Sequence, residues 1–274
     1  MKALSILTSI LFFSIVTFAY TVDTVMVYSV GMRKNIPNLV ILPEGYKSQT
    51  TNFPVLYLLH GAGGDYKSWL TNMPDLGGEV DKYNLVFVCP DGGGTSWYFD
   101  SPVDTSMKYE TYITSELVKY IDRAYRTIEG AKGRAITGYS MGGHGAFYLS
   151  FKHQEVWGAA GSMSGGMDIR PFPENWDIAK RLGPLKKQAE NWDKNTVINM
   201  TQFLEGGTLK LIFDCGVDDF FYTVNKSLHE KLLKGKIPHN YTEKPGNHGW
   251  EYWKDSFRYQ LLFFNQYFDS ENKK

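Results

Sequence analysis

Short apolar runs alternate with helical patterns along most of the chain. Residues 53–60 (FPVLYLLH) and 84–90 (NLVFVCP) are nearly continuous apolar runs, which is typical of strands buried on both faces of a sheet. Residues 109–125 and 250–268 instead place apolar side chains at the spacing of amphipathic helices. This alternation predicts an α/β fold with a mostly parallel central sheet and helices on both faces.

The remaining segments follow the same rhythm. Apolar or alternating patterns predict further strands, the last of them an outer strand, at residues 21–29, 38–43, 133–138, 156–165, 209–216 and 239–246. Helices are expected over residues 141–153 and 221–235. The chain shows neither repeats nor a low-complexity linker, so we expect one domain over residues 20–274.

Residues 166–205 interrupt this rhythm. The stretch contains three prolines, several charges, Trp176 and Trp192, and only short helical patterns. Because it lies between two expected core strands, we expect a small cap-like insertion over the carboxyl edge of the sheet, where open α/β sheets bind ligands. A surface insertion without a role is the alternative.

The first 19 residues have a pattern of their own. One lysine precedes an uncharged, mostly apolar run, and the small residues Thr17 and Ala19 stand at a cleavage-like position. This pattern predicts a secretory signal peptide over residues 1–19 and a secreted or periplasmic mature protein without stable membrane association. A retained anchor is the alternative, because the run is about long enough to span a bilayer.

Charge and cysteine content narrow the possible functions. The 274 residues include 29 basic and 29 acidic side chains, without a block of like charge, which argues against nucleic acid as a partner. No Cys/His cluster has the spacing of metal ligands, and we expect neither a metal nor a cofactor. Cys89 and Cys215 end strands that the expected topology separates, so both should be free thiols.

The clearest chemical motif is GYSMG, which centres on Ser140. It follows an expected strand and opens an expected helix, and this is the setting of a nucleophile elbow, in which a strained turn exposes the serine hydroxyl. Strand and helix approach closely there, so the flanking positions must be small, and they are Gly138 and Gly142. We therefore expect Ser140 to be a nucleophile.

A nucleophilic serine needs a base and an acid. In α/β-hydrolases the order along the chain is serine, acid and histidine, which places the base at His248, in the loop before the last helix. The acid should follow the preceding strand, where spacing alone does not separate Asp218 from Asp219; the other carboxylate should cap the next helix. Asp214, still within the strand, is expected to support that loop.

The remaining histidines receive structural interpretations. His60 should shape the glycine-rich loop that follows it, and His144 should pack against the sheet. His153 and His229 fall on or near helices, where we expect exposure to solvent, and His239 begins the outer strand.

An oxyanion hole requires two backbone donors. One should be the N–H of Met141, the residue after the nucleophile, and the other should come from the loop after the first buried strand. That loop reads HGAGGD, and the N–H of Ala62 is the candidate. A plain tight turn is the alternative for this loop.

With these residues placed, the sequence resembles the esterase D / tributyrin esterase family of α/β-hydrolases, which is similar to bacterial feruloyl esterases, S-formylglutathione hydrolases and the mycolyltransferase antigens. The matching stretches occur in the family's order at residues 58–65, 90–102, 109–122, 138–146, 214–221 and 246–253. The resemblance implies an α/β-hydrolase fold and supports Ser140, His248, Ala62 and Met141 in the roles given above.

The resemblance also decides between the two aspartates. The family's C-G-x-x-D-F pattern falls on residues 215–220 and favours Asp219 as the acid. In the stretch SWYFDSP, Trp97 and Tyr98 match a family segment that lines the site, which implies a role in substrate binding. The chain departs from the formylglutathione hydrolases in two respects: their His-Gly loop carries a cysteine that is absent here, and they are cytosolic, whereas we expect this chain to be exported.

These observations together predict a secreted serine carboxylesterase that forms an acyl-enzyme. Export and the 15% aromatic content favour feruloyl or acetyl esters of plant cell-wall polysaccharide, or small-molecule esters, as substrates. The alternatives are an acyltransferase with the same triad, a short-chain acyl or S-formylglutathione hydrolase, and a non-catalytic carbohydrate-binding relative. The sequence leaves the oligomeric state open.

Overall fold

The computed structural model describes residues 20–204 and 208–273, and its centre is one eight-stranded sheet. The strand order is β1-β2-β4-β3-β5-β6-β7-β8; β2 is antiparallel to both β1 and β4, and the remaining pairs are parallel. The strands are β1 (Thr21–Ser29), β2 (Lys34–Leu42), β3 (Val55–Leu59), β4 (Val86–Pro90), β5 (Arg134–Gly138), β6 (Ala159–Met163), β7 (Lys210–Gly216) and β8 (Asn240–Lys244). The predicted α/β-hydrolase fold, with its mostly parallel sheet, is confirmed.

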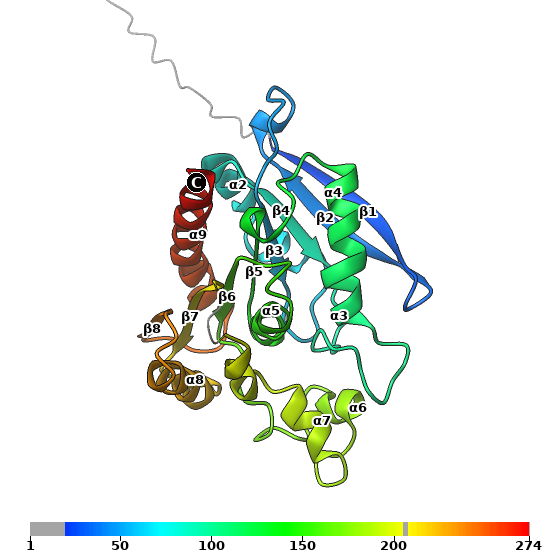
Figure 1. Ribbon diagram of the computed structural model, residues 1–274, viewed down its shortest axis with the longest axis vertical. Helices are drawn as coiled ribbons and strands as arrows, with labels where there is room; N and C mark the ends of the chain where they lie inside the picture. Colours follow the sequence, from blue (N-terminus) through cyan, green and yellow to red (C-terminus); the bar gives the residue numbers. More distant parts are fainter. Residues whose placement is uncertain (1–19, 205–207, 274) are drawn as a thin grey trace, which may run out of the picture.

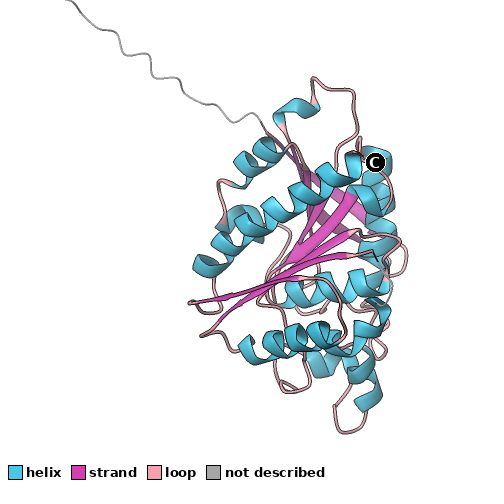
Figure 2. Ribbon diagram, turned by 60° about the vertical axis from the view of Figure 1, so that its left-hand side comes forward, coloured by secondary structure: helices cyan, strands magenta, loops and turns pink. Residues whose placement is uncertain are grey.

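Helices cover both faces of the sheet, which runs between them as a twisted layer (Figure 2). Side chains of α1 (Ser68–Asn72), α2 (Leu76–Tyr83) and α9 (Trp250–Asn272) pack in one hydrophobic cluster. Side chains of α4 (Val118–Ala124), α5 (Met141–Lys152) and α8 (Tyr222–Lys234) pack in a second cluster on the other face. Between these layers every residue of β3, β4, β5 and β6 is buried, as the apolar runs predicted.

Two helical regions differ from expectation. The helix predicted over 109–125 is divided into α3 (Tyr109–Thr111), a π-helical segment η2 (Tyr112–Leu117) and α4. Helices α1 and α2 were not predicted, because α1 has only five residues and α2 contains two adjacent glycines. Short 3-10 turns, η1 (Glu44–Tyr46) and η3 (Ala131–Gly133), complete the connections before β5.

The segment between β6 and β7 contains α6 (Ile178–Leu182), α7 (Ala189–Lys194) and the 3-10 helix η4 (Val197–Leu204). It lies at the lower end of the molecule in Figure 1, and η4 packs on α5. The cap-like insertion predicted at 166–205 corresponds to this segment in sequence. The predicted signal peptide lies outside the described residues.

Two further expectations concern bilayer contact and thiols. Within the described ranges, no helix combines the length and the hydropathy that crossing a bilayer requires. Cys89 and Cys215 are both buried and free, as predicted.

Candidate active site

Ser140 occupies the turn between β5 and α5, with a backbone φ of 57° and ψ of −121°. This strained left-handed conformation is one that non-glycine residues rarely adopt outside functional turns. The crowding explains the flanking glycines: a Cβ atom on Gly142 would lie 2.4 Å from the Leu59 carbonyl oxygen, and one on Gly138 would lie 2.5 Å from the Gly142 backbone. The two glycines therefore allow strand β5 and helix α5 to approach closely on either side of the turn that carries Ser140.

Three loops at the carboxyl edge of the sheet bring Ser140, His248 and Asp219 together. Nε2 of His248 lies 2.8 Å from the Ser140 Oγ, and Nδ1 lies 2.8 Å and 3.0 Å from the two Asp219 carboxylate oxygens. Because a carboxylate can only accept, Nδ1–H donates to Asp219, and Nε2 is left to accept from the serine hydroxyl. This arrangement can remove a proton from Ser140.

The surroundings of Asp219 differ from those of the two neighbouring aspartates, Asp218 and Asp214. The Asp219 side chain is fully buried, and one of its oxygens also accepts the backbone N–H of Phe221 at 2.8 Å. Asp218 is exposed, and no side chain caps α8, so the expected capping by the second carboxylate is wrong. Asp214 accepts from Ser256 and Gln260 of α9; it supports that helix and not the loop, which corrects the second expectation.

Three aromatic rings hold the His248 imidazole. The Phe220 ring centroid lies 4.1 Å away, and Trp253 and Phe221 approach edge-on at 4.9 Å and 5.5 Å. Close packing of this kind restricts the imidazole to the orientation in which it reaches both Ser140 and Asp219.

Of the two predicted oxyanion donors, Ala62 lines the cavity over Ser140, and Met141 directly follows Ser140. Met141 is the first residue of α5, where N–H groups have no partner within the helix and favour negative charge. Ala62 lies in a tight turn closed by a hydrogen bond of 3.1 Å from Gly64 N–H to Gly61 O. Within the described part of the chain, neither the Ala62 N–H nor the Met141 N–H donates to another protein group. Both are therefore free to bind an oxyanion.

His60 anchors the loop that carries Ala62. Its Nδ1–H donates to the Gly61 carbonyl at 2.8 Å, and its Nε2 accepts the Gly92 N–H at 2.8 Å. Burial lowers the pKa of His60, so the ring stays neutral and retains the one tautomer that satisfies both bonds. The prediction that His60 shapes the loop is confirmed.

A cavity of about 460 Å³ opens over Ser140 and His248. Its wall combines the glycine turn, two polar side chains and five aromatic rings. The lining residues are Gly61, Ala62, Gly63, Gly64, Ser68, Asn72, Tyr139, Ser140, Trp176, Phe220, His248, Trp250 and Trp253.

Trp97 and Tyr98, which the resemblance placed on the substrate, do not line this cavity. They are 1% and 0% exposed, with φ angles of 56° and 61° that turn the chain inward. Trp97 Nε1–H donates to the Trp176 carbonyl at 3.1 Å, and the Tyr98 hydroxyl donates to the His60 carbonyl at 3.0 Å. The structure therefore corrects the prediction: both residues support the cavity wall from behind.

Sequence reasoning gave no role to the five aromatic rings that line the cavity. A signal was present, because Trp250 and Trp253 lie in the matching stretch GNHGWEYW and Phe220 lies beside Asp219. Tyr139 directly precedes Ser140. Trp176 belongs to the insertion, whose approach to the site depends on tertiary packing.

The other histidines have partners that the sequence did not indicate. His144 is buried; its ring lies against Trp97, Phe99 and Tyr148, its Nε2–H donates to the Asn195 carbonyl, and burial lowers its pKa to about 3. It thus joins α5 to the 166–205 insertion, whereas we expected packing against the sheet.

His153 and His229, predicted to be exposed, are half-buried. A hydrogen bond to Glu110 raises the pKa of His153. His229 bonds to His239 at 2.8 Å, and burial lowers its pKa. These pairs fix α5 and α8 to neighbouring segments, away from Ser140.

Comparison with known proteins agrees with this geometry. The model of the family described as "Esterase" matches residues 29–264. Esterase Rv1288 of Mycobacterium tuberculosis is 29% identical over 248 residues, which cover 81% of this chain but only 54% of that protein, so the chain spans about half of its length. The acetyl esterase of Caldicellulosiruptor saccharolyticus is 25% identical over 245 residues, covering 82% of this chain and 91% of that protein.

Among solved structures, a ferulic acid esterase superposes with a TM-score of 0.77 at 27% identity and covers 92% of this chain and 100% of its own. The similarity therefore extends over most of this chain.

Proposed function

The chain belongs to the esterase family, and on that premise we propose that it is a serine carboxylesterase in which Ser140, His248 and Asp219 form the catalytic triad. The observation that carries the proposal is the contact of 2.8 Å between Ser140 Oγ and His248 Nε2, with Asp219 on the opposite ring nitrogen. A structural serine would not require the strained turn that exposes it.

The geometry supports a two-step reaction. Ser140 Oγ attacks the ester carbonyl carbon while His248 Nε2 takes the hydroxyl proton, and the carbonyl oxygen becomes an oxyanion held by the N–H groups of Ala62 and Met141. His248 then gives the proton to the alcohol oxygen as the C–O bond breaks, which leaves an acyl-serine. Water, deprotonated by His248, hydrolyses the acyl-serine and restores Ser140. Each oxyanion donor typically contributes about 3 to 4 kcal/mol to such a step.

For the substrate we propose feruloyl or acetyl esters of plant cell-wall polysaccharide. The five aromatic rings of the cavity suit a flat or apolar acyl group, and the similar proteins include a ferulic acid esterase and an acetyl esterase. The reaction written above requires no cofactor.

We further propose that residues 1–19 are a signal peptide and that the mature enzyme is secreted or periplasmic. The n-region, apolar run and small residues of the sequence support this. Intact-mass measurement of the protein released by cells should show a chain beginning near Tyr20; a chain that retains residues 1–19 would contradict it.

The decisive experiment compares Ser140→Ala with Ser150→Ala, which changes a buried serine of α5 whose hydroxyl donates a hydrogen bond to the Phe147 carbonyl. On p-nitrophenyl acetate we expect Ser140→Ala to lose at least about 10⁴-fold in kcat, and Ser150→Ala to stay within about threefold of wild type. A fluorophosphonate should label wild type at Ser140. Unchanged turnover in Ser140→Ala would refute the triad.

A substrate panel then tests the acyl group. Methyl ferulate, acetylated xylan, short p-nitrophenyl esters and S-formylglutathione should be compared by kcat/KM, with the first two expected to lead. A preference for S-formylglutathione would contradict the proposed substrate while leaving the triad intact.

A further inference from the structure

The cavity over Ser140 has two aromatic walls of different character. One wall consists of Tyr139, Trp250 and Trp253, whose rings contact one another with centroids 4.6 Å and 5.6 Å apart. Tyr139 and Trp253 are only 6% and 7% exposed. The other wall consists of Trp176 and Phe220, stacked at 5.5 Å, and Phe220 is 50% exposed. Trp250 and Trp176 are both half-buried, so the second wall is the more exposed one only through Phe220.

The exposed wall lies beside the proton donor of the reaction. Of the rings that contact His248, Phe220 is the nearest, with its centroid 4.1 Å from the imidazole. In the proposed mechanism His248 gives its proton to the leaving alcohol oxygen, so the alcohol half of the ester lies next to His248, which Phe220 contacts more closely than Trp253 of the other wall does, at 4.1 Å against 4.9 Å. The alcohol also departs first and needs a path to water, whereas the acyl group stays on Ser140 until hydrolysis.

The backbone holds Trp176 in this place at an energetic cost. Trp176 and Asp177 are consecutive left-handed residues, with φ angles of 46° and 58°, and such residues cost about 1 kcal/mol or more each. Three contacts fix them: Trp97 Nε1–H to the Trp176 carbonyl at 3.1 Å, Thr95 hydroxyl to Asp177 at 3.0 Å, and Lys180 to Asp177 at 2.8 Å. Strain that the surroundings enforce in this way is typical of functional sites.

The chemistry around this wall fits a hydroxylated ring. Glu174 and Asn175, which precede Trp176, are exposed, and Asp177 and Lys180 follow it. A sugar ring has apolar C–H surface that can pack on an aromatic side chain, while its hydroxyl groups remain with water and a polar rim.

We propose that Trp176, together with Phe220, is the specificity-determining surface for the alcohol half of the substrate, and that this alcohol is a sugar. The inference rests on the proposed esterase function and adds the side of the cavity on which the sugar binds. Trp97, Thr95 and the 166–205 insertion then serve to position Trp176.

The test uses two esters with the same acyl group, methyl ferulate and a feruloyl arabinose ester. For each protein we divide kcat/KM for the sugar ester by kcat/KM for the methyl ester. In Trp176→Ala we expect this ratio to fall about tenfold, which corresponds to a loss of roughly 1.4 kcal/mol of aromatic contact with the sugar. The rate of deacylation, measured after a burst, should match wild type, because both esters give the same acyl-enzyme. Thr95→Val should lower the same ratio by about threefold, because it releases Asp177.

The matched control is Phe203→Ala, an exposed aromatic residue of the same insertion that lies outside the cavity; its ratio should not change. An unchanged ratio in Trp176→Ala, or a slower deacylation with both esters affected equally, would overturn the proposal in favour of an acyl-side or purely structural role. A wild-type protein that hydrolyses neither ester, nor p-nitrophenyl acetate, would instead refute the esterase function itself.

Discussion

Asp214 and Asp219 are two buried carboxylates of one β7–loop segment that have opposite surroundings. Both residues are 5% exposed. Asp219 faces the imidazole of His248, whereas Asp214 lies under α9 and accepts from Ser256 at 2.5 Å and from Gln260 at 2.9 Å. Burial raises the pKa of Asp214 to about 6. A carboxylate with neutral partners is thus held near its titration point, close to one that contacts the imidazole of His248.

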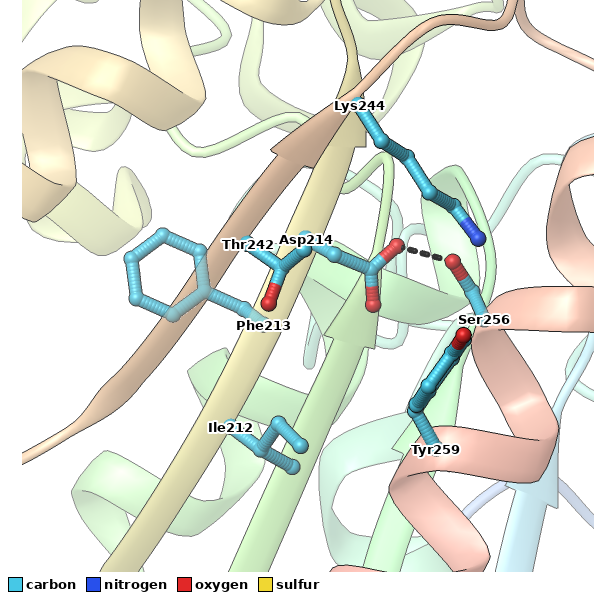
Figure 3. Close-up of a pocket in the computed structure, with 7 residues that line it drawn as sticks. All are labelled: Ile212, Phe213, Asp214, Thr242, Lys244, Ser256 and Tyr259. Carbon is cyan, nitrogen blue, oxygen red and sulfur yellow. Dashed lines mark hydrogen bonds between the residues drawn. The ribbon is translucent and has the colours of Figure 1, made fainter.

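Asp214 lines a second cavity, of about 220 Å³, which lies between β7, β8 and α9. In Figure 3 the Asp214 carboxylate points toward the Ser256 hydroxyl, with Lys244 above it and Tyr259 below. Lys244 pairs with Asp255 and does not bond to Asp214. Burial alone therefore does not identify an acid that can serve a catalytic histidine; the group that the carboxylate contacts does.

The largest effect should come from Asp219→Asn. An amide in this place donates as well as accepts, so it favours the wrong tautomer of His248, and we expect kcat to fall about 10³- to 10⁴-fold. The control is Asp218→Asn, its exposed neighbour, which should stay within about twofold. Steady-state hydrolysis of p-nitrophenyl acetate measures both. A comparable loss in Asp218→Asn would contradict the assignment of the acid.

Asp214→Asn should affect stability and spare catalysis. The pKa of Asp214 is raised on folding, from 3.8 to about 6, so the native state binds the extra proton and wild type loses stability as pH rises from about 4 to about 6. The amide carries no such charge, and its NH₂ can face Ser256 while its oxygen faces Gln260. The difference in unfolding free energy between the variant and wild type should therefore change in favour of the variant by on the order of 3 kcal/mol from pH 4 to pH 8.

Urea unfolding at the two pH values measures this difference, and other titrating groups cancel between the two proteins. The kcat of Asp214→Asn at pH 7 should remain within about threefold. A catalytic loss as large as that of Asp219→Asn would contradict the conclusion that Asp214 serves stability and not catalysis.

The sequence predicted those parts of the fold and site that depend on local pattern. Apolar runs located the buried strands, and the glycines around Ser140 indicated the elbow because crowding at a strand–helix turn leaves room for nothing larger. The order of the motifs also led to His248. By contrast, spacing left Asp218 and Asp219 unresolved, since a one-residue shift in a loop reverses which side chain turns inward.

The predictions that were wrong or missing concern residues whose positions depend on tertiary packing. Trp97 and Tyr98 were placed on the substrate, but positive φ angles direct both rings into the core, and a local pattern does not show this. Trp176 reaches the cavity from the insertion through tertiary contacts, among them those with Trp97 and Phe220. Asp214 was assigned to the loop because it is close to the loop in sequence. Its actual partners lie far along the chain, on α9, and a local pattern does not reveal them.

The smallest of the three effects should come from Ser256→Ala, which removes one donor from Asp214 and leaves the carboxylate in place. A hydrogen bond to a buried charge contributes about 1.5 to 3 kcal/mol, and one to a neutral group about 1. We therefore expect a loss of about 2 kcal/mol at pH 7, where Asp214 is ionised, and about half of that at pH 4, where it is protonated. Ser270→Ala, at an exposed serine of the same helix, should cost less than about 0.5 kcal/mol at either pH. A loss in Ser256→Ala that does not change with pH would show that Asp214 keeps one protonation state throughout, and the contrast with Asp219 would then rest on geometry alone.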